Sequence, residues 1–474
     1  MKLFKLISLG IICMLGQSMH LYGKGDTIVV NTVDELVKYA SKDGNIVKLK
    51  EGTYDLDSDF KGKLLMIYPP ANQKTKDLSK SRWGVLLNIS GNDNVFDLRG
   101  TKIRIDNRLL SSCGKNKVFE CLVSGNNNVI YGLNIEDYGD MPPANSAVTL
   151  NVKGDDNILK NTELYVVGSV PYGYGHLLGK GAKYIYKHKK HSSLLITGTN
   201  TQILNAKVVT HAYGHGIVIQ GAVNTLIKDS YVEGKMRSTD EMLKETSGPA
   251  HSVGFKSIYP PGYIEKGHML ALSEDAYRAY PSGANRRRTK GITIINCTAY
   301  NMRGAFPLAL ASSEEKILVK DCKAIACQSG YSVPSNGVIE GCSGDAMYGA
   351  LLSFPYKHIK NCRISLTLKP ETSEFMPSRL LEINGYDHFI EIGLDGKLPK
   401  GYITPIVFGE SERADMAFFE NPKVEPKKVS GAVGVELVNR TGLPILLNDR
   451  CENCKITTGG KVTDNGIRTL INGK

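Results

Sequence analysis

The sequence predicts an all-β protein folded as a parallel β-helix, and three observations support this fold class. Short phrases ending in cysteine follow apolar, strand-like stretches, at Cys297, Cys322, Cys342 and Cys362. Their spacing of 20 to 25 residues is typical of a solenoid, in which no single coil buries its apolar face alone. The residue before each cysteine is Asn, Asp or Gly, which suits a left-handed turn or a ladder of side-chain amides.

The same register extends to both sides of these four cysteines. A small residue fills the cysteine position upstream, at Thr162, Ala206 and Ser230, and Asn453-Cys454 repeats it near the end. One small residue recurring at one position indicates positions that stack inward, roughly 4.8 Å apart along the axis. We therefore expect the four cysteines to form one buried column of small apolar groups, with disulfides between coils as the alternative.

The beginning of the chain predicts export. Lys2 and Lys5 precede an apolar run over residues 6–15, and short polar residues follow up to Gly23. This pattern is typical of a secretory signal peptide, so we expect residues 1–23 to be removed and the protein to be periplasmic or secreted. No later segment is apolar enough for stable membrane insertion. Without a linker-like stretch, residues 24–474 are expected to form a single β-helix domain.

A short amphipathic helix is predicted before the first coils. Thr32 and Glu35 form a capping box, and apolar residues follow at helical spacing up to Ala40. The open end of a solenoid exposes strand edges and an apolar core. We expect this helix to cap the N-terminal coil.

The charge of the chain indicates an acidic partner. The formal net charge is +12, and removal of the two lysines of the signal peptide leaves +10. A basic exported protein commonly meets an acidic polymer by electrostatic attraction. Without a nucleic-acid-binding motif, an anionic glycan is the expected partner and nucleic acid is not. The sequence indicates no oligomeric state.

The leader, the capping helix followed by Glu51-Gly52-Thr53-Tyr54, and the Asn-Cys turns together resemble the pectate-lyase-like superfamily of right-handed parallel β-helices. The resemblance covers roughly residues 26–474 and implies a right-handed coil. That superfamily includes polysaccharide lyases, glycoside hydrolases, transglycosylating enzymes, esterases and non-catalytic adhesins. The quoted motifs select no single member family, so no catalytic residue is transferred from it.

Two coils contain long insertions, at about residues 170–193 and 234–290, and both open at the same turn. Long loops without a repeat of their own are commonly lids or binding walls. Aromatic rings among cations suit sugars that bear carboxylates or sulfates. The candidate substrate-binding residues are Tyr172, Tyr174, His176, Arg237 and, from a later coil, Tyr348.

The catalytic hypothesis comes from aligning the coils. The residue before the last glycine of this turn is Tyr174, His215, Arg303, Ser329 and Tyr348 in successive coils, which predicts a column. His211, Tyr213 and His215 alternate, and period-two spacing would place them on one side of an extended segment. The candidate catalytic residues are therefore His211, Tyr213, His215 and Arg303.

These residue types suit β-elimination on a uronate, which requires a neutralised carboxylate and a base. Arg303 would neutralise the carboxylate, His215 or Tyr213 would act as the base, and Tyr174 or Tyr348 would protonate the leaving oxygen. We expect no metal and no other cofactor. Calcium, which some members of the superfamily use, has no clear acidic cluster here. The sequence thus favours a secreted polysaccharide lyase acting on an acidic polysaccharide or oligosaccharide.

Two alternatives remain open at this point. The first is a glycoside hydrolase or a glycosyl-transferring enzyme that uses two carboxylates. Its candidates are Asp240, Glu241, Glu274 and Asp275, in the second insertion. The second alternative is a non-catalytic solenoid that binds a glycan, which would be favoured if the His/Tyr/Arg column faced away from any cleft.

Overall fold

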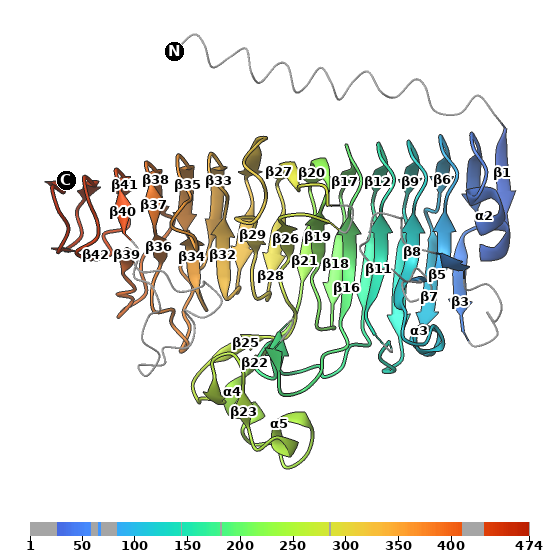
Figure 1. Ribbon diagram of the computed structural model, residues 1–474, viewed down its shortest axis with the longest axis horizontal. Coiled ribbons are helices and arrows are strands. Elements are labelled where there is room, and N and C mark those ends of the chain that lie inside the picture. The colour runs from blue at the N-terminus through green and yellow to red at the C-terminus, as the bar shows by residue number, and fades with distance from the viewer. Residues whose placement is uncertain are drawn as a thin grey trace, which may run out of the picture.

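The strands stack in parallel along one axis and form a parallel β-helix, as the sequence predicted (Figure 1). The computed structural model describes residues 26–57, 65–67, 83–143, 145–180, 183–283, 286–409 and 431–473. The predicted signal peptide, residues 1–23, lies outside these ranges. One wall is a 23-stranded sheet that runs the length of the solenoid, from β1 (Thr27–Val30) to β45 (Leu470–Gly473).

The opposite wall consists of two seven-stranded sheets that follow each other along the axis. The first, called here the N-terminal wall sheet, contains β4 (Leu65–Ile67), β5 (Trp83–Ile89), β8 (Lys117–Val123), β11 (Ala147–Val152), β16 (His191–Ile196), β19 (Ile217–Gln220) and β26 (Tyr277–Tyr280). The second contains β29 (Phe306–Pro307), β32 (Ser329–Ser332), β34 (Ala350–Ser353), β36 (Leu381–Ile383), β39 (Ile406–Phe408), β42 (Ile445–Leu447) and β44 (Val462–Asp464). A single apolar core fills the interior between the walls.

Turns in the left-handed region recur at one position of successive coils. Asn161, Asn205, Asp229 and Asn296 have φ values between 51° and 56°. The Asn205 amide donates to Asn161 Oδ1 at 2.7 Å, and the Asn296 amide donates to Asp229 Oδ1 at 2.7 Å. Asn and Asp tolerate this backbone region better than other side chains. Both halves of the turn prediction, the backbone geometry and the amide ladder, are therefore confirmed.

Three of the four cysteines form the expected inward column. The backbone N–H of Cys297 donates to Cys322 Sγ at 3.4 Å, and that of Cys322 donates to Cys342 Sγ at 3.3 Å. The prediction was wrong for Cys362, because Cys342 pairs in register with Leu366 instead. The nine cysteines in the described residues are all buried and free, as expected for a stack of small apolar groups.

The cause of this difference is strand β33 (Val338–Gly344). Earlier coils cross the large sheet as two short strands separated by a turn, such as β27 (Lys290–Ile295) and β28 (Thr298–Tyr300). β33 instead runs through the turn position, with a register shift between Ile339 and Cys342. Later coils therefore have only one of the two turns. Cys362 follows this remaining turn, whereas Cys297, Cys322 and Cys342 follow the position of the turn that is lost.

Helix α2 (Val33–Ala40) lies between the first strands of the solenoid. The Thr32 side chain accepts a hydrogen bond from the Glu35 N–H, and the Glu35 carboxylate accepts one from the Asn31 N–H at 2.8 Å. Val33 and Ala40 are buried in the main core. None of the helices in the described ranges is long and apolar enough to cross a bilayer.

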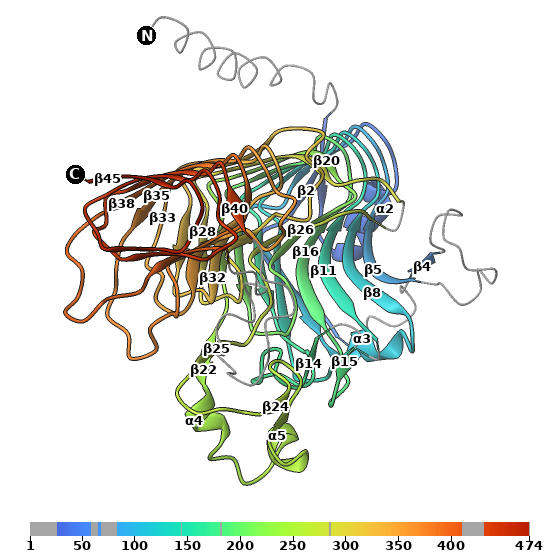
Figure 2. The same ribbon diagram turned by 60° about the vertical axis from the view of Figure 1, so that its left-hand side comes forward.

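Both insertions leave the solenoid at the same turn, between the large sheet and the N-terminal wall sheet. The first follows β13 (Glu163–Val166) and the second follows β21 (Tyr231–Glu233). They contain β14 (Gly179–Lys180), β15 (Lys183–Tyr184), β22 (Met236–Ser238), α4 (Thr239–Met242), α5 (Pro249–Ser252), β23 (Lys256–Ser257), β24 (Gly262–Tyr263) and β25 (Met269–Ala271). Their elements project together from one side of the solenoid (Figure 1 and Figure 2).

The two insertions share a small apolar core of their own, separate from the solenoid core. It contains Tyr174, Leu177, Leu178, Met242, Ala250, Ile264, Leu270 and Leu272. The second insertion ends earlier than the predicted residue 290, because β26 pairs in parallel with β19 and belongs to the solenoid. This shorter boundary moves Glu274 and Asp275 out of a loop and into a coil.

Candidate functional site

A buried cluster of charged side chains lies where the second insertion rejoins the solenoid. Glu274 and Asp275 lie just before β26, separated from it by Ala276, and His215 and Arg303 come from the coils on either side. Gly216 N donates to Asp275 O at 2.9 Å, and Arg303 N donates to Glu274 O at 3.0 Å, so the backbone sets this alignment. All four side chains belong to residues that are 5 % exposed or less.

Three cations hold the two carboxylates. The Arg303 guanidinium donates from Nε and Nη2 to the two oxygens of Asp275, at 3.1 and 3.0 Å, and from Nη1 to Glu274 Oε1 at 3.3 Å. Lys190 Nζ, from the end of the first insertion, donates to Glu274 Oε1 at 2.8 Å. Arg278 Nη1 lies 3.6 Å from Asp275 Oδ2. The cluster therefore fixes its charges in place before any ligand binds.

Burial and charge pairing act in opposite directions on these groups. Burial alone would raise the pKa of Asp275, but Arg303, Arg278 and His215 hold that pKa well below its usual value. Burial would likewise raise the pKa of Glu274, and His215, Lys190 and Arg303 lower it. Both carboxylates are thus ionised at neutral pH, and their nearest partners are positive charges. This donor set does not fit a calcium ion, which needs six to eight available oxygens.

Both ring nitrogens of His215 have partners. Asp275 N donates to Nδ1 at 3.1 Å, while Nε2 lies 2.9 Å from the Tyr280 hydroxyl and 3.3 Å from Glu274 Oε2. Burial lowers the pKa of His215 to about 4, against the opposite effect of the two carboxylates. The neutral ring therefore carries its proton on Nε2. In this arrangement neither nitrogen is available to take a proton from a substrate, and the ring positions Tyr280 and Glu274.

A cavity of about 280 Å³ opens beside the cluster, lined among others by Lys180, Asp275, Arg278 and Arg303. Lys180 ends β14 of the first insertion. Burial and the charge of Arg303 lower the pKa of Lys180 to about 7. An amine with such a pKa is partly unprotonated at neutral pH, as a general base must be.

The sequence analysis did not select Lys180, Arg278 or Tyr280. Lys180 is one of several lysines in the first insertion, and no local pattern separates it from the others. Arg278 and Tyr280 alternate with the buried Tyr277 and Ala279 of β26. This alternation in the sequence could have identified β26 as a strand of the solenoid, with Arg278 and Tyr280 on its outer face. It was missed because residues 234–290 were assigned to an insertion.

Tyr213 lies at the edge of the charged cluster and His211 lies apart from it. Tyr213 is buried, its hydroxyl donates to Gly179 O at 3.4 Å, and Lys190 Nζ lies 5.0 Å from its ring centre. His211 Nδ1 instead lies 3.0 Å from the hydroxyl of Tyr165, on the large sheet. The structure thus brings Tyr213, His215 and Arg303 together, without His211.

The candidate binding residues of the insertions mostly contact one another. The Tyr174 hydroxyl donates to Glu245 Oε2 at 2.8 Å, and Arg237 Nη2 donates to Glu245 Oε1 at 2.6 Å. Tyr172 packs against the same small core. His176 is buried, and burial together with the charge of Arg303 lowers its pKa. Of these residues, His176 is the one whose pKa responds to the charged cluster.

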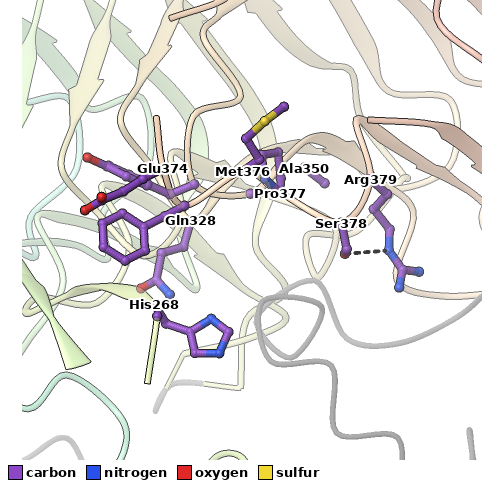
Figure 3. Close-up of a pocket in the computed structure, with 12 residues that line it drawn as sticks. His268, Gln328, Ala350, Glu374, Met376, Pro377, Ser378 and Arg379 are labelled. Carbon is purple, nitrogen blue, oxygen red and sulfur yellow. Dashed lines mark hydrogen bonds between the residues drawn. The ribbon is translucent and has the colours of Figure 1, made fainter. Parts of the chain in front are cut away.

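Tyr348 lines a different cavity, of about 320 Å³, two coils further along. Figure 3 shows this cavity between His268 of the second insertion, Gln328 of the solenoid and the segment from Glu374 to Arg379. Gln328 Oε1 accepts a hydrogen bond from Ala271 N at 2.8 Å, which ties the insertion to the wall between the two cavities.

The four candidate carboxylates for hydrolysis lie in two separate places. Glu274 and Asp275 belong to the charged cluster. Asp240 and Glu241 lie on α4, where Asp240 Oδ2 accepts from Gly267 N at 3.1 Å and the Glu241 side chain is 66 % exposed. The structure therefore does not assemble the four into one site.

The comparisons with known proteins concern the fold. The sequence matches no family model and no curated protein. A PL6 alginate lyase solved in complex with a trisaccharide has a TM-score of 0.51 at 10 % identity, covering 93 % of this chain and 87 % of that one. A rhamnogalacturonan lyase has a TM-score of 0.41 at 10 % identity, covering 79 % of this chain and 83 % of that chain. The first likeness confirms the parallel β-helix fold.

Proposed function

We propose that the protein is a polysaccharide lyase that cleaves a uronate-containing anionic polysaccharide by β-elimination. The observation that carries this proposal is one cavity lined by Lys180, with a pKa of about 7, and by the guanidinium groups of Arg278 and Arg303. Elimination requires a base for the proton beside a carboxylate, and positive charge to neutralise that carboxylate. The fold shared with an alginate lyase agrees with this chemistry.

Each step of the elimination has a candidate group. Arg278, with 22 % of its side chain exposed, binds the uronate carboxylate, and Arg303 adds positive charge behind it. Unprotonated Lys180 removes the proton from the carbon beside that carboxylate. The electron pair forms a carbon–carbon double bond as the glycosidic carbon–oxygen bond breaks. Tyr280 gives its proton to the departing oxygen.

Tyr280 is suited to the role of the acid. Burial and the nearby carboxylates raise its pKa to about 12, so the hydroxyl keeps its proton at neutral pH. The hydroxyl lies 2.9 Å from His215 Nε2, which fixes its orientation. Arg278 and Tyr280 alternate with buried residues on β26 and face outward together. His215 is thus a positioning residue in this proposal, in place of the base first expected.

Hydrolysis receives less support from the same geometry. A glycoside hydrolase needs one protonated carboxylic acid beside one carboxylate. The pKa values of Glu274 and Asp275 are both lowered, and Arg303 holds both oxygens of Asp275 and Oε1 of Glu274. A purely binding solenoid does not require a lysine with a pKa near 7.

We further propose that the protein acts after export, directed by residues 1–23, as one right-handed β-helix domain. In this proposal α2 covers the N-terminal coil, because it buries Val33, Leu36 and Ala40 against the main core. The signal peptide would be tested by sequencing the N-terminus of the protein recovered from the medium or periplasm.

The reaction class is tested with purified protein and a panel of acidic and neutral polysaccharides. We expect depolymerisation of a uronate polymer, with the ultraviolet absorption of an unsaturated uronate in the products. New reducing ends without that absorption would replace the lyase by a hydrolase. Binding to the polymer without any cleavage would replace both by the glycan-binding solenoid.

The role of Lys180 is tested by its pH profile. The value of kcat/KM should rise with pH through about 7, because only the unprotonated amine accepts a proton. Lys180→Arg keeps the charge but stays protonated, so it should lower kcat/KM by about 10²- to 10⁴-fold and abolish this rise. Lys183→Arg, on the paired strand β15, is the matched control and should keep the parent profile. Parent activity in Lys180→Arg would assign the base to another residue.

A further inference from the structure

A second polar cluster lies inside the solenoid, apart from the proposed active site. It contains Glu120 of β8, Asp137 of β10 (Asn134–Tyr138) and His191 of β16, all 1 % exposed or less. One donor atom from each of the three lies within 4.8 Å of the others. Three different strands on both walls thus bring their polar atoms to one point in an otherwise apolar core.

The two carboxylates of this cluster lack compensation. Neither oxygen of Glu120 has a hydrogen-bond partner, nor does Asp137 Oδ1. Within the described residues no lysine or arginine lies at ion-pair distance from either carboxylate, and His191 is the ionisable group that reaches both. An uncompensated ion in a protein interior is strongly destabilising. The cluster therefore requires positive charge, supplied either by protons that the side chains share or by a metal ion.

The orientation of His191 is that of a metal ligand. Its Nδ1 lies 2.7 Å from Val167 O and donates to it, which leaves the lone pair on Nε2. A backbone carbonyl in this position is the usual outer partner of a metal-bound histidine. Nε2 lies 3.3 Å from Glu120 Oε1. Two ligands of a tetrahedral zinc ion, with bonds of about 2.0–2.1 Å, lie about 3.3–3.4 Å apart.

We propose that Glu120, Asp137 and His191 bind one structural divalent transition-metal ion, of which Zn²⁺ fits the site best. One imidazole nitrogen and two carboxylate oxygens suit zinc, whereas calcium would require more oxygens. Thr149 Oγ1, 3.0 Å from His191 Nε2, is a further polar atom beside the site that could complete the coordination. The sequence could not indicate this site, because its ligands have no characteristic spacing.

The ion would hold together coils that also support the proposed active site. His191 directly follows Lys190, which donates to Glu274 in the charged cluster. A metal bond to His191 therefore fixes the first residue of β16 and, through it, the position of Lys190. The rival explanation is that protons shared among the three side chains replace the metal.

The test uses the full-length mature chain and measures metal content and stability. Because the cluster is buried, the protein is unfolded and refolded in chelator alone, or with Zn²⁺ or Mn²⁺ added after the chelator is removed. We expect about one zinc ion per chain by mass spectrometry of the dialysed protein. The zinc-loaded protein should also have a higher Tm than the chelator-refolded protein, because a ligand that binds only the folded state stabilises it.

Isosteric variants then identify the ligands. Glu120→Gln and Asp137→Asn should lose the stoichiometric zinc, and the Tm of each should no longer respond to Zn²⁺. His388→Gln is the control, because His388 is buried but contacts the backbone at Cys362 N and Asn384 O. It should retain the metal even where its Tm falls.

The refolded parent protein gives the decisive result where a variant does not fold. Parent protein that contains no stoichiometric Zn²⁺ or Mn²⁺ and shows one Tm in all three refolding conditions would overturn the proposal. Shared protons would then account for the cluster, and Glu120→Gln should leave the Tm unchanged or raise it.

Discussion

At the scale of single residues, Arg303 contributes to the stability of the fold, which the alignment of the coils did not predict. Its guanidinium bridges Asp275 and Glu274, both buried. Loss of one partner of a buried ion pair leaves an uncompensated charge and costs about 3–5 kcal/mol. A change at this residue therefore affects stability as well as activity.

We expect Arg303→Met to lower the free energy of unfolding at pH 7 by about 3–5 kcal/mol, measured by urea denaturation. Arg440→Met is the control, because Arg440 forms an exposed pair with Glu391 and should lose less than about 1 kcal/mol. Arg303→Lys should recover only part of the loss, since an ammonium lacks the forked geometry of a guanidinium.

The pH dependence gives a second measurement of the same pair. The pKa of Asp275 is lower in the folded protein than in the unfolded chain. Its stabilising contribution is therefore present above the unfolded pKa of about 3.9 and is lost as the pH falls towards the folded pKa. Arg303→Met should show a smaller acid-induced loss of stability than the parent. An identical pH dependence in both proteins would contradict the assigned pairing.

The sequence predicted part of the site because a solenoid repeats its backbone. His215 and Arg303 occupy one turn of nearby coils, so alignment of the coils found both. Lys180 remained hidden because its position depends on how two insertions pack around their shared core, at Leu177 and Leu270 among others. No local repeat encodes that packing. Glu274 and Asp275 were noticed, but as loop carboxylates for a different reaction.

At the scale of elements, buried asparagines connect the N-terminal coils. Asn94 N donates to Asn128 Oδ1 at 3.0 Å, and Asn128 N donates to Asn157 Oδ1 at 2.9 Å. The Asn128 amide donates to Gly91 O at 3.0 Å. The Asn128 side chain thus satisfies two polar groups of the preceding coil, while its own backbone N–H is satisfied by the next coil.

We expect Asn128→Leu to lower the free energy of unfolding by about 3 kcal/mol or more, because each buried group left unpaired costs about 1–3 kcal/mol. Asn127→Gly is the neighbouring control. Asn127 has a φ of 54°, which glycine adopts without strain, and its amide donates to Asp93 at the surface. The control should change stability by less than about 1 kcal/mol. An equal loss of unfolding free energy in the two variants would show that the buried asparagine hydrogen bonds do not stabilise the coils.

At this scale the sequence predicted the parallel β-helix, but it did not predict that the later coils have one turn fewer than the earlier ones. Asparagine, small and apolar residues repeat in phase from coil to coil, which determines the parallel stacking. The register shift in β33 removes one turn from the later coils, and Gly341 of that strand reads like an ordinary turn residue. Cys362 therefore looked equivalent to Cys342 although it follows a different turn.

At the scale of the whole molecule, the outer face of the N-terminal wall sheet offers a path for a long substrate. A cavity of about 560 Å³ is lined by Trp83, Phe119, Lys117, Lys153 and Arg287, among others. Lys153 Nζ lies 5.6 Å from the Trp83 ring centre. Tyr280 of the proposed site packs against the apolar cluster that Trp83 also contacts. Aromatic rings beside cations suit an anionic sugar chain.

One lysine of the first insertion is already engaged in the charged cluster and is not available to a substrate on this path. Of Lys187, Lys189 and Lys190, Lys190 donates a hydrogen bond to Glu274 in the charged cluster. The cations that line the cavity of the wall sheet, Lys117, Lys153 and Arg287, would then attract the anionic substrate. Such attraction weakens as salt screens it.

We expect Trp83→Ala to raise KM for a long uronate polymer by about 10-fold, which corresponds to a lost contact of about 1.4 kcal/mol, while kcat changes little because the ring lies away from the cleavage site. A trisaccharide or shorter substrate, held at the cleavage site alone, should show parent kinetics. Trp83 is the single tryptophan of the chain, so polymer binding should also change the intrinsic fluorescence of the parent protein.

Tyr263→Ala is the control for the loss of an aromatic ring, because Tyr263 is 65 % exposed on β24 of the second insertion, away from the wall sheet. It should leave KM for the polymer unchanged. Lys153→Ser should raise KM at low salt and lose this effect at high salt, whereas the Trp83→Ala effect should persist because stacking is not screened. A KM that changes equally for polymer and trisaccharide in Trp83→Ala would place the tryptophan at the cleavage site. No change in KM or fluorescence would mean that the polymer crosses the solenoid elsewhere, with the cavity at Tyr348 and Gln328 as the next candidate.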